Sequence, residues 1–234
     1  MIRRNFFMRN YMTDSAFQLS DLRLYNLRLL CFWPIFFLVF TYAEKFFPAA
    51  HYFSMHCRLD DLIPFCKYAV VPYVAWFVWI PFTLFYFLWK APRADFWRLC
   101  LPLFAGMTLA LACYAILSTG LDLRPYRVYG SDIFARMVRM IYASDTPMNV
   151  CPSIHVFNSV TLMMAYYRSR FLDAPQRRWM RPAAAVLCVS IVCSTVLLKQ
   201  HSCIDVVLGI LLAMALDSAA TALEHSERRV LQRL

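Results

Sequence analysis

Two short polar segments in an otherwise apolar chain carry side chains that could act as nucleophiles, acids or bases. The first, Cys151 to His155, reads Cys-Pro-Ser-Ile-His, and the second, Lys199 to Asp205, reads Lys-Gln-His-Ser-Cys-Ile-Asp. His201 and Asp205 are four residues apart and therefore share one face of a helix. The carboxylate can then fix one ring nitrogen as a donor and leave the other free to attack or to accept a proton. An isolated His-x-x-x-Asp motif more often caps a helix or lines a packed interior. Here a second His beside a Ser, in the first segment, favours a catalytic or binding site.

Both segments are expected to begin apolar helices that run in the same direction, so the two helix starts should lie on one face of the protein. Helix amino termini carry free N–H groups and the positive end of the helix dipole, which together attract anions such as phosphate. Pro152 suits a first helical turn, where its missing N–H costs nothing. Arg124 and Pro125 follow the preceding apolar segment and add a cation. The pattern predicts an anion site built at helix ends.

The composition indicates a membrane protein with a single domain. Of the 234 residues 61% are apolar and only 16% are charged, whereas soluble domains average about 45–50% apolar and about 25% charged. The length suits one compact unit, residues 1–234, with no evident repeat. Five of the nine cysteines lie inside apolar runs, so cysteine usage does not assign a redox compartment.

Six apolar segments predict an all-α bundle of six transmembrane helices. A span needs about 20 apolar residues, and the first and last segments meet this only if flanking charges reach the interface. The segments are Leu29–Ala43, Tyr68–Trp89, Leu99–Leu121, a helix that starts near Pro152 and ends before Arg168, Pro182–Leu198 and Val206–Leu223. Asp217 interrupts the last one and is expected to pair with an Arg, because an unpaired acid at mid-membrane is costly.

The distribution of basic residues predicts the orientation. With both termini in the cytoplasm, 16 of the 24 Lys and Arg residues fall on the cytoplasmic side, as the positive-inside rule requires. The predicted site then faces the extracytoplasmic side of the cell membrane. The net charge of +10 reflects this bias and attraction to anionic lipid, so no nucleic-acid partner is expected. Residues 1–28, basic and aromatic, are expected to lie in the membrane interface.

The order of these motifs resembles the type 2 phosphatidic acid phosphatase (PAP2) superfamily, which also includes vanadium haloperoxidases and, more distantly, sphingolipid phosphotransferases. Arg-Pro is followed by Pro-Ser-Ile-His and then by Ser, with His-x-x-x-Asp seven residues later. The resemblance covers about residues 114–209, and Asp60 to Phe65 resembles a segment of the bacterial membrane branch. It implies a PAP2-like helical bundle and a lipid phosphatase that hydrolyses a phosphomonoester or pyrophosphate headgroup, with a phospholipid or polyprenyl phosphate as substrate.

The resemblance also implies a role for each site residue. His201 would be the nucleophile that forms a phosphohistidine, Asp205 its orienting partner, and His155 the general acid that protonates the leaving alkoxide. Arg124, Ser153 and nearby backbone N–H groups would hold the phosphoryl oxygens. The scheme requires no metal ion and no other cofactor.

Two departures from the family pattern leave alternatives open. Leu117 and Thr195 stand where the family has Lys and Arg, so two expected cations are missing, and Lys199 is expected to replace that charge near the phosphate. A phosphotransferase shares the first half-reaction, and a catalytically inactive lipid-binding relative fits the missing cations. The sequence leaves open the oligomeric state and a disulfide between Cys151 and Cys203.

Overall fold

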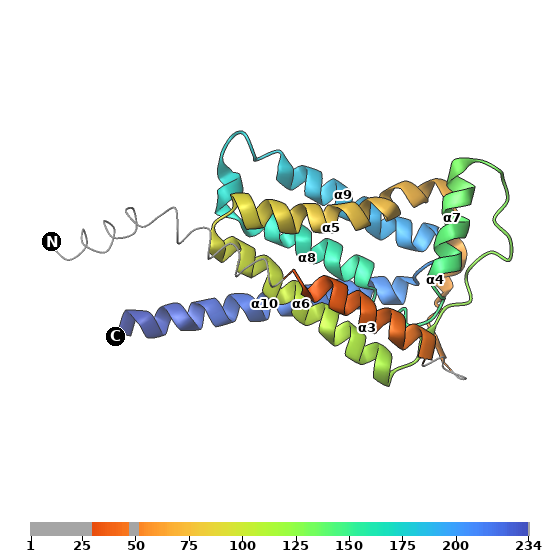
Figure 1. Ribbon diagram of the computed structural model, residues 1–234, viewed down its shortest axis with the longest axis horizontal. Coiled ribbons are helices and arrows are strands. Elements are labelled where there is room, and N and C mark those ends of the chain that lie inside the picture. Colours follow the sequence, from red (N-terminus) through yellow and green to blue (C-terminus); the bar gives the residue numbers. More distant parts are fainter. Residues whose placement is uncertain (1–29, 47–51, 234) are drawn as a thin grey trace.

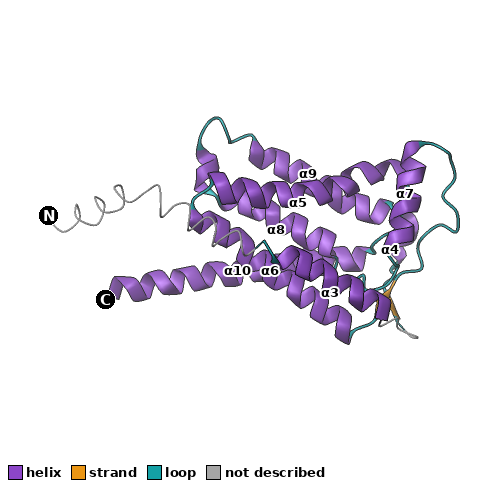
Figure 2. Cartoon of the chain, viewed as in Figure 1, coloured by secondary structure: helices purple, strands orange, loops and turns teal. Residues whose placement is uncertain are grey.

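The computed structural model describes residues 30–46 and 52–233, so the expected interfacial segment 1–28 lies outside the described residues. Six longer helices form a bundle (Figure 1), and each falls on one of the six predicted apolar segments. They are α3 (Phe32–Phe46), α5 (Val70–Lys90), α6 (Arg93–Ile116), α8 (Ile154–Arg168), α9 (Met180–Leu197) and α10 (Cys203–Arg233). The expectation of an all-α fold is therefore confirmed in outline, because the described chain is mostly helical (Figure 2).

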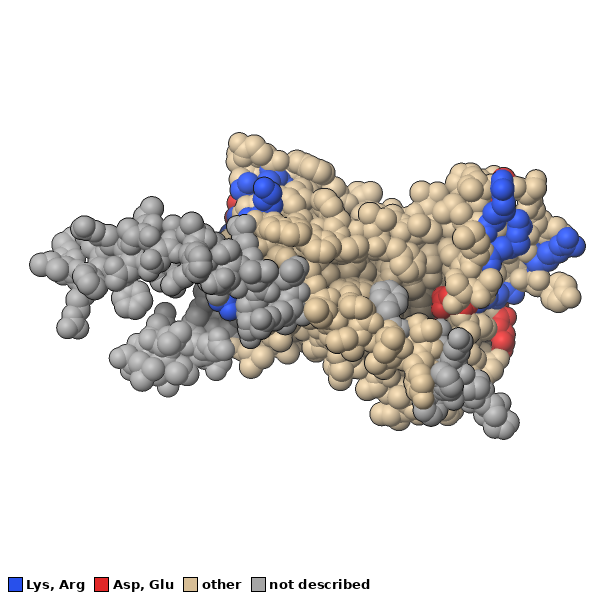
Figure 3. Space-filling view, viewed as in Figure 1, with Lys and Arg blue, Asp and Glu red and all other residues tan. Residues whose placement is uncertain are grey.

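Four of these helices are long and apolar enough to cross a membrane. They cover residues 67–90, 93–116, 180–197 and 203–223. Helices α3 and α8 have 15 residues each, fewer than the roughly 20 that a full span requires, so the predicted count of six spans is not confirmed. In the space-filling view, Lys and Arg gather at the two ends of the bundle, and the face between them is nearly free of charge (Figure 3).

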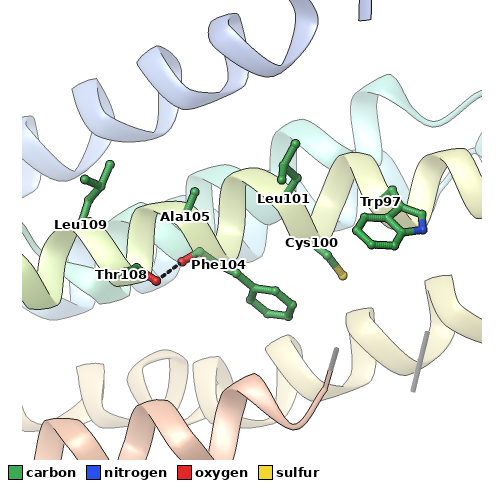
Figure 4. A pocket seen from close by; sticks show the side chains of 7 residues that line it. All are labelled: Trp97, Cys100, Leu101, Phe104, Ala105, Thr108 and Leu109. Atoms are coloured by element: carbon green, nitrogen blue, oxygen red, sulfur yellow. Dashed lines mark hydrogen bonds between the residues drawn. The ribbon is translucent and has the colours of Figure 1, made fainter. Parts of the chain in front are cut away.

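One side of α6 carries a groove lined almost entirely by apolar side chains. Figure 4 shows the side chains that line a shallow groove there: Trp97, Cys100, Leu101, Phe104, Ala105, Thr108 and Leu109. The one hydroxyl among them, on Thr108, donates to the Phe104 carbonyl at 2.8 Å within the same helix. Polar groups exposed to hydrocarbon need such internal partners, so this face suits contact with lipid.

Helix α8 is the centre of the bundle and contacts α5, α6, α9 and α10 (Figure 1). Its Phe157 packs against Gly106 of α6, where a Cβ atom would lie 1.9 Å from the ring. Toward the other end of α8, the hydroxyls of Tyr166 and Thr83 of α5 are hydrogen-bonded at 3.0 Å in the interior. This packing fixes the position of α8, and with it the position of His155 in its first turn.

The amino termini of α8 and α10 are held side by side. The Ser153 N–H donates to the Asp205 carbonyl at 3.3 Å. One turn further along α10, Gly209 faces the Ser153 carbonyl, which would lie 2.9 Å from a Cβ atom at that position. A larger residue at position 209 would push the two helix starts apart. The expectation that they share one end of the bundle is confirmed by these contacts.

The same end carries small elements that the hydropathy pattern does not reveal. They are β1 (Phe53–Ser54), α4 (Arg58–Leu62), the 3₁₀ turn η1 (Lys67–Ala69), β2 (Thr119–Gly120) and α7 (Ile133–Ser144). Strands β1 and β2 pair in parallel, with Phe53 opposite Thr119, and Gly120 forms a further antiparallel bridge with Met148. These pairings fasten the segment before α4, the end of α6 and the loop before α8 to one another.

Helix α7 lies across the end of the bundle (Figure 1). The Asp132 carboxylate caps it by accepting from the Ala135 N–H at 3.1 Å, and also pairs with the Lys67 ammonium at 2.5 Å. At the other end of α7, the Tyr142 hydroxyl donates to the Leu198 carbonyl at 2.6 Å. Helix α7 is thereby anchored to both η1 and the turn that leads into α10.

The opposite end of the bundle contains the ion pair expected for Asp217. The Arg168 guanidinium at the end of α8 pairs with the buried Asp217 carboxylate and also donates to the Asp217 carbonyl at 3.2 Å. The second short 3₁₀ turn, η2 (Arg170–Asp173), follows directly. An acid inside the last helix is thus compensated by an Arg.

Candidate active site

The two histidines singled out by the sequence meet at the α7 end of the bundle. Their ring centroids lie 5.6 Å apart, although the residues are far apart along the chain. A cavity of about 40 Å³ touches both imidazoles, and Phe40, Tyr114 and Gln200 also line it. The two motifs, which are far apart in the sequence, thus share one small cavity.

His201 has the carboxylate of Asp205 on one side of its ring. Its Nδ1 lies 3.5 Å from the Asp205 Oδ2, close enough for an ion pair but longer than an ordinary hydrogen bond. Asp205 is fully buried, and the same oxygen accepts from the Ser202 N–H at 2.9 Å. This contact fixes the carboxylate, which leaves the His201 Nε2 as the ring atom that faces away from it.

His155 lies in an aromatic enclosure that the sequence analysis missed. The ring of Tyr73 stacks on it at 4.6 Å, and the Trp76 ring lies 4.3 Å away, both from α5. Phe77 makes an edge contact at 6.1 Å. These rings restrict the orientation of the imidazole and exclude water from its faces. Their spacing along α5 looks like ordinary core packing, so no local signal identified them.

Several buried polar atoms around the cavity have no hydrogen-bond partner among the described residues. They are the His155 Nε2, the His201 Nδ1, the Gln200 Nε2 and the Asp205 Oδ1. Leaving buried polar atoms unpaired is costly, and most proteins avoid it. Their concentration at one cavity indicates a place for a polar ligand. Gln200 is a possible donor to that ligand that sequence analysis did not single out.

Arg124 lies at the rim of this cavity. Its guanidinium donates to the Gln200 side chain, to the Asp145 carbonyl at 2.8 Å and to the Thr146 carbonyl at 3.3 Å, and it lies over the Tyr142 ring at 4.7 Å. Burial raises the pKa of the Asp145 carboxyl, although the positive charge of Arg124 opposes that shift. Arg124 thus contacts three residues that line the cavity, and its role as a phosphate ligand stays a prediction.

The other two predicted phosphate ligands have structural partners. Ser153 is buried, and its hydroxyl caps α8 by accepting from the Val156 N–H at 3.3 Å. The Lys199 ammonium donates to the carbonyls of Asp60 and Ile63 at 2.6 and 2.5 Å. Neither residue lines the cavity. A phosphate-binding role for Lys199 therefore stays a prediction without a supporting contact.

The two residues that depart from the family pattern supply no charge here. Leu117 is the C-cap residue directly after α6 and is half exposed. Thr195 is fully buried, and its carbonyl accepts from the N–H groups of Gln200 and His201 at 2.9 and 3.2 Å. Lys199 in the same turn has a φ of +52°, a left-handed conformation that is uncommon and strained for such a residue. Strain of this kind tends to occur at functional sites.

Asp60 joins the α4 segment, here residues 57–63, to the turn that carries His201. Its carboxylate accepts from the Ser202 hydroxyl at 2.6 Å, from the Cys203 N–H at 2.8 Å and from the Cys57 N–H at 2.8 Å. Burial would raise the pKa of this carboxyl, but these hydrogen bonds outweigh it and lower the pKa to about 2. Because the pKa of Asp60 is lower in the folded protein than in the unfolded chain, where it is about 4, the ionised carboxylate stabilises the fold at pH values above about 4. This contribution is lost as the pH falls toward 2.

Replacing Asp60 with Ala should therefore destabilise the site end of the protein. The change leaves three donors without their acceptor, and we expect an apparent loss of about 3 kcal/mol, since each hydrogen bond to a charged group contributes about 1.5–3 kcal/mol. Thermal unfolding of purified protein at neutral pH measures it. Asp61→Ala is the matched control, because Asp61 forms an exposed pair with His56 that should contribute less than about 1 kcal/mol. Equal effects of the two substitutions would contradict the role given to Asp60.

Comparison with known proteins agrees with the motifs. Residues 123–229 match the family model described as PAP2 superfamily, a range that includes Arg124, both histidines and Asp205. The resemblance inferred from the motifs is thus confirmed, because this part of the chain is similar to the PAP2 superfamily. No curated protein and no solved structure matches the chain significantly.

Proposed function

We propose that this protein is a membrane phosphatase that hydrolyses the phosphate of a lipid through a phosphohistidine intermediate. The observation that carries the proposal is the meeting of His155 and His201 at one cavity, with Asp205 beside the His201 ring. Arg124 contacts the lining residue Gln200, and unpaired polar atoms surround the cavity. The apolar helices and the family match support a membrane protein of the phosphatase type.

In the proposed reaction, the His201 Nε2 attacks phosphorus while Asp205 stabilises the charge that develops on the ring. The bond from phosphorus to the lipid oxygen breaks, and His155 gives its proton to the departing alkoxide. Water then attacks the phosphohistidine, and His155 accepts a proton from it. Inorganic phosphate leaves, and both histidines return to their starting forms.

Negative charge on the transferring phosphoryl group needs compensation in the transition state. Gln200 lines the cavity and is hydrogen-bonded to Arg124, so the Gln200 amide and the Arg124 guanidinium are the side-chain donors that we assign to this charge. The starts of α8 and α10 add N–H groups and the positive ends of two helix dipoles. These groups replace part of the charge that Leu117 and Thr195 do not supply. A metal ion has no part in this scheme.

The position of the cavity supports a substrate carried by a lipid. The cavity lies near the starts of α8 and α10, and a headgroup could reach it there while the lipid tail stays in the bilayer. We therefore propose a phospholipid or polyprenyl phosphate as substrate. The distribution of Lys and Arg along the sequence supports an extracytoplasmic site under the positive-inside rule.

Release of inorganic phosphate from a panel of phospholipid and polyprenyl phosphates tests the proposal. We expect the purified protein to release phosphate from at least one lipid in excess EDTA, and vanadate, which mimics a five-coordinate phosphoryl group, to inhibit it. A strict requirement for Mg²⁺ would contradict the mechanism. Transfer of the phosphate to a lipid hydroxyl, without release, would identify a phosphotransferase, and no turnover of any lipid would favour an inactive lipid-binding relative.

A further inference from the structure

Three groups outside the cavity converge at the start of α10. The Sγ atoms of Cys57 and Cys203 and a carboxylate oxygen of Asp60 all lie within 4.8 Å of one another. Both thiols are free and partly accessible. The two cysteines come from segments 146 positions apart in the chain, so their approach is a product of the fold. Neither one takes part in the proposed phosphatase chemistry.

The backbone around this thiol pair is already fixed. One carboxylate, that of Asp60, accepts from the N–H groups of both Cys57 and Cys203 at 2.8 Å, so the two backbones cannot lie far apart. The Lys199 ammonium holds the next turn of the same segment through the carbonyls of Asp60 and Ile63. A disulfide bond is about 2.05 Å long, and small side-chain rotations can close the gap between two sulfurs at the observed separation.

We propose that Cys57 and Cys203 form a disulfide that locks the α4 segment to the start of the helix that follows His201. The two thiols lose two protons and two electrons to a disulfide oxidant, such as oxidised glutathione or an oxidised dithiol oxidoreductase, which is reduced to two thiols. This pairing replaces the one between Cys151 and Cys203 that sequence proximity to the motifs had left open. The Asp60 oxygens already accept three hydrogen bonds, which favours a disulfide over a metal ion at this place.

The cross-link would act mainly on stability. It closes a loop that contains most of the bundle, and long closed loops restrict the unfolded chain most in the chain-entropy model. It would also hold Asp60 against Ser202 when thermal motion or low pH weakens their hydrogen bond. We expect oxidation to raise the apparent Tm by about 5 °C or more.

Peptide mapping of the full-length protein tests the inference without reference to its activity. The protein is treated in membranes with oxidised glutathione, its remaining thiols are blocked, and the digest is analysed by mass spectrometry. We expect a linked pair of peptides that carries Cys57 and Cys203, and a rise in Tm that reducing agent reverses. Cys57→Ser and Cys203→Ser should each abolish the rise. Cys66→Ser, which alters a free thiol between α4 and η1, should retain the rise in Tm.

Three results would overturn the proposal. Both thiols could stay unlinked under conditions that oxidise other exposed cysteines of the protein. Cys203 could be found linked to Cys151. Stoichiometric zinc could co-purify with the protein and be lost in Cys57→Ser, which would make the cluster a metal site instead.

Discussion

Replacing His201 with Asn lowers kcat/KM for a lipid phosphate by about 10⁴-fold or more, if this residue is the nucleophile. Loss of the attacking atom removes the covalent route entirely, and comparable deletions of an enzyme nucleophile have effects of this size or larger. The measurement is phosphate release from the best lipid of the panel. The fold should be little affected, because the His201 Nδ1 forms no hydrogen bond with any described residue and its contact with the Asp205 carboxylate is long, at 3.5 Å. Thermal unfolding of the variant checks this.

His56→Asn is the matched control for this substitution. His56 lies at the same end of the protein but pairs with Asp61 in an exposed position. We expect its replacement to change kcat/KM by less than about twofold, because exposed ion pairs contribute little. If His201→Asn behaved like His56→Asn in a folded protein, the assignment of the nucleophile would be wrong.

Replacing His155 with Gln should separate the two halves of the reaction. With a lipid phosphate, whose alkoxide leaving group needs a proton, turnover should fall by about 10²–10⁴-fold, the usual contribution of a general acid. With an aryl phosphate the leaving group needs no proton, so the first step should survive. The second step still needs a base for water. Stopped-flow measurement should therefore show a burst of about one molecule of the released phenol per protein molecule, followed by slow turnover.

The comparison of the two substrates needs no further control variant, because both are measured with the same His155→Gln protein. A purely structural role for His155 predicts equal losses for both substrates and no burst. Its contacts with Tyr73 and Trp76 make such a role a real alternative, since the ring fills an aromatic enclosure. Gln keeps much of the volume and the polar end of the side chain, so a loss through poor packing should be small and visible as a lower Tm.

Much of this arrangement could be predicted from sequence because its signals are local. Hydropathy located six helical segments, and the spacing from His201 to Asp205 placed both on one helix face. The number of full spans could not be settled that way, since α8 carries only 15 helical residues and is enclosed by other helices. A buried helix and a membrane span have the same apolar composition. Helix α7 was missed although Phe134, Val138 and Ile141 already show helical spacing.

The contacts that depend on long-range packing could not be predicted from the sequence. Lys199 lies two residues before His201, which suggested the phosphate as its partner, but its ammonium reaches the α4 segment instead. The sequence left open a disulfide between Cys203 and Cys151, because each lies beside a motif. In the structure the Cys203 thiol lies near the Cys57 thiol. The aromatic enclosure of His155 comes from α5, which carries no motif residue. In each case the partner is set by how distant segments dock.

Trapping the phosphorylated protein tests the central claim most directly. The His155→Gln protein is mixed with a ³²P-labelled aryl phosphate and quenched in alkali, where phosphohistidine survives, before peptide mapping. The account predicts about one label per protein molecule, stable in alkali, lost in acid, and located on His201. The protein that also carries His201→Asn should hold none. An acid-stable label, or an acid-labile label that persists without His201, would contradict the account.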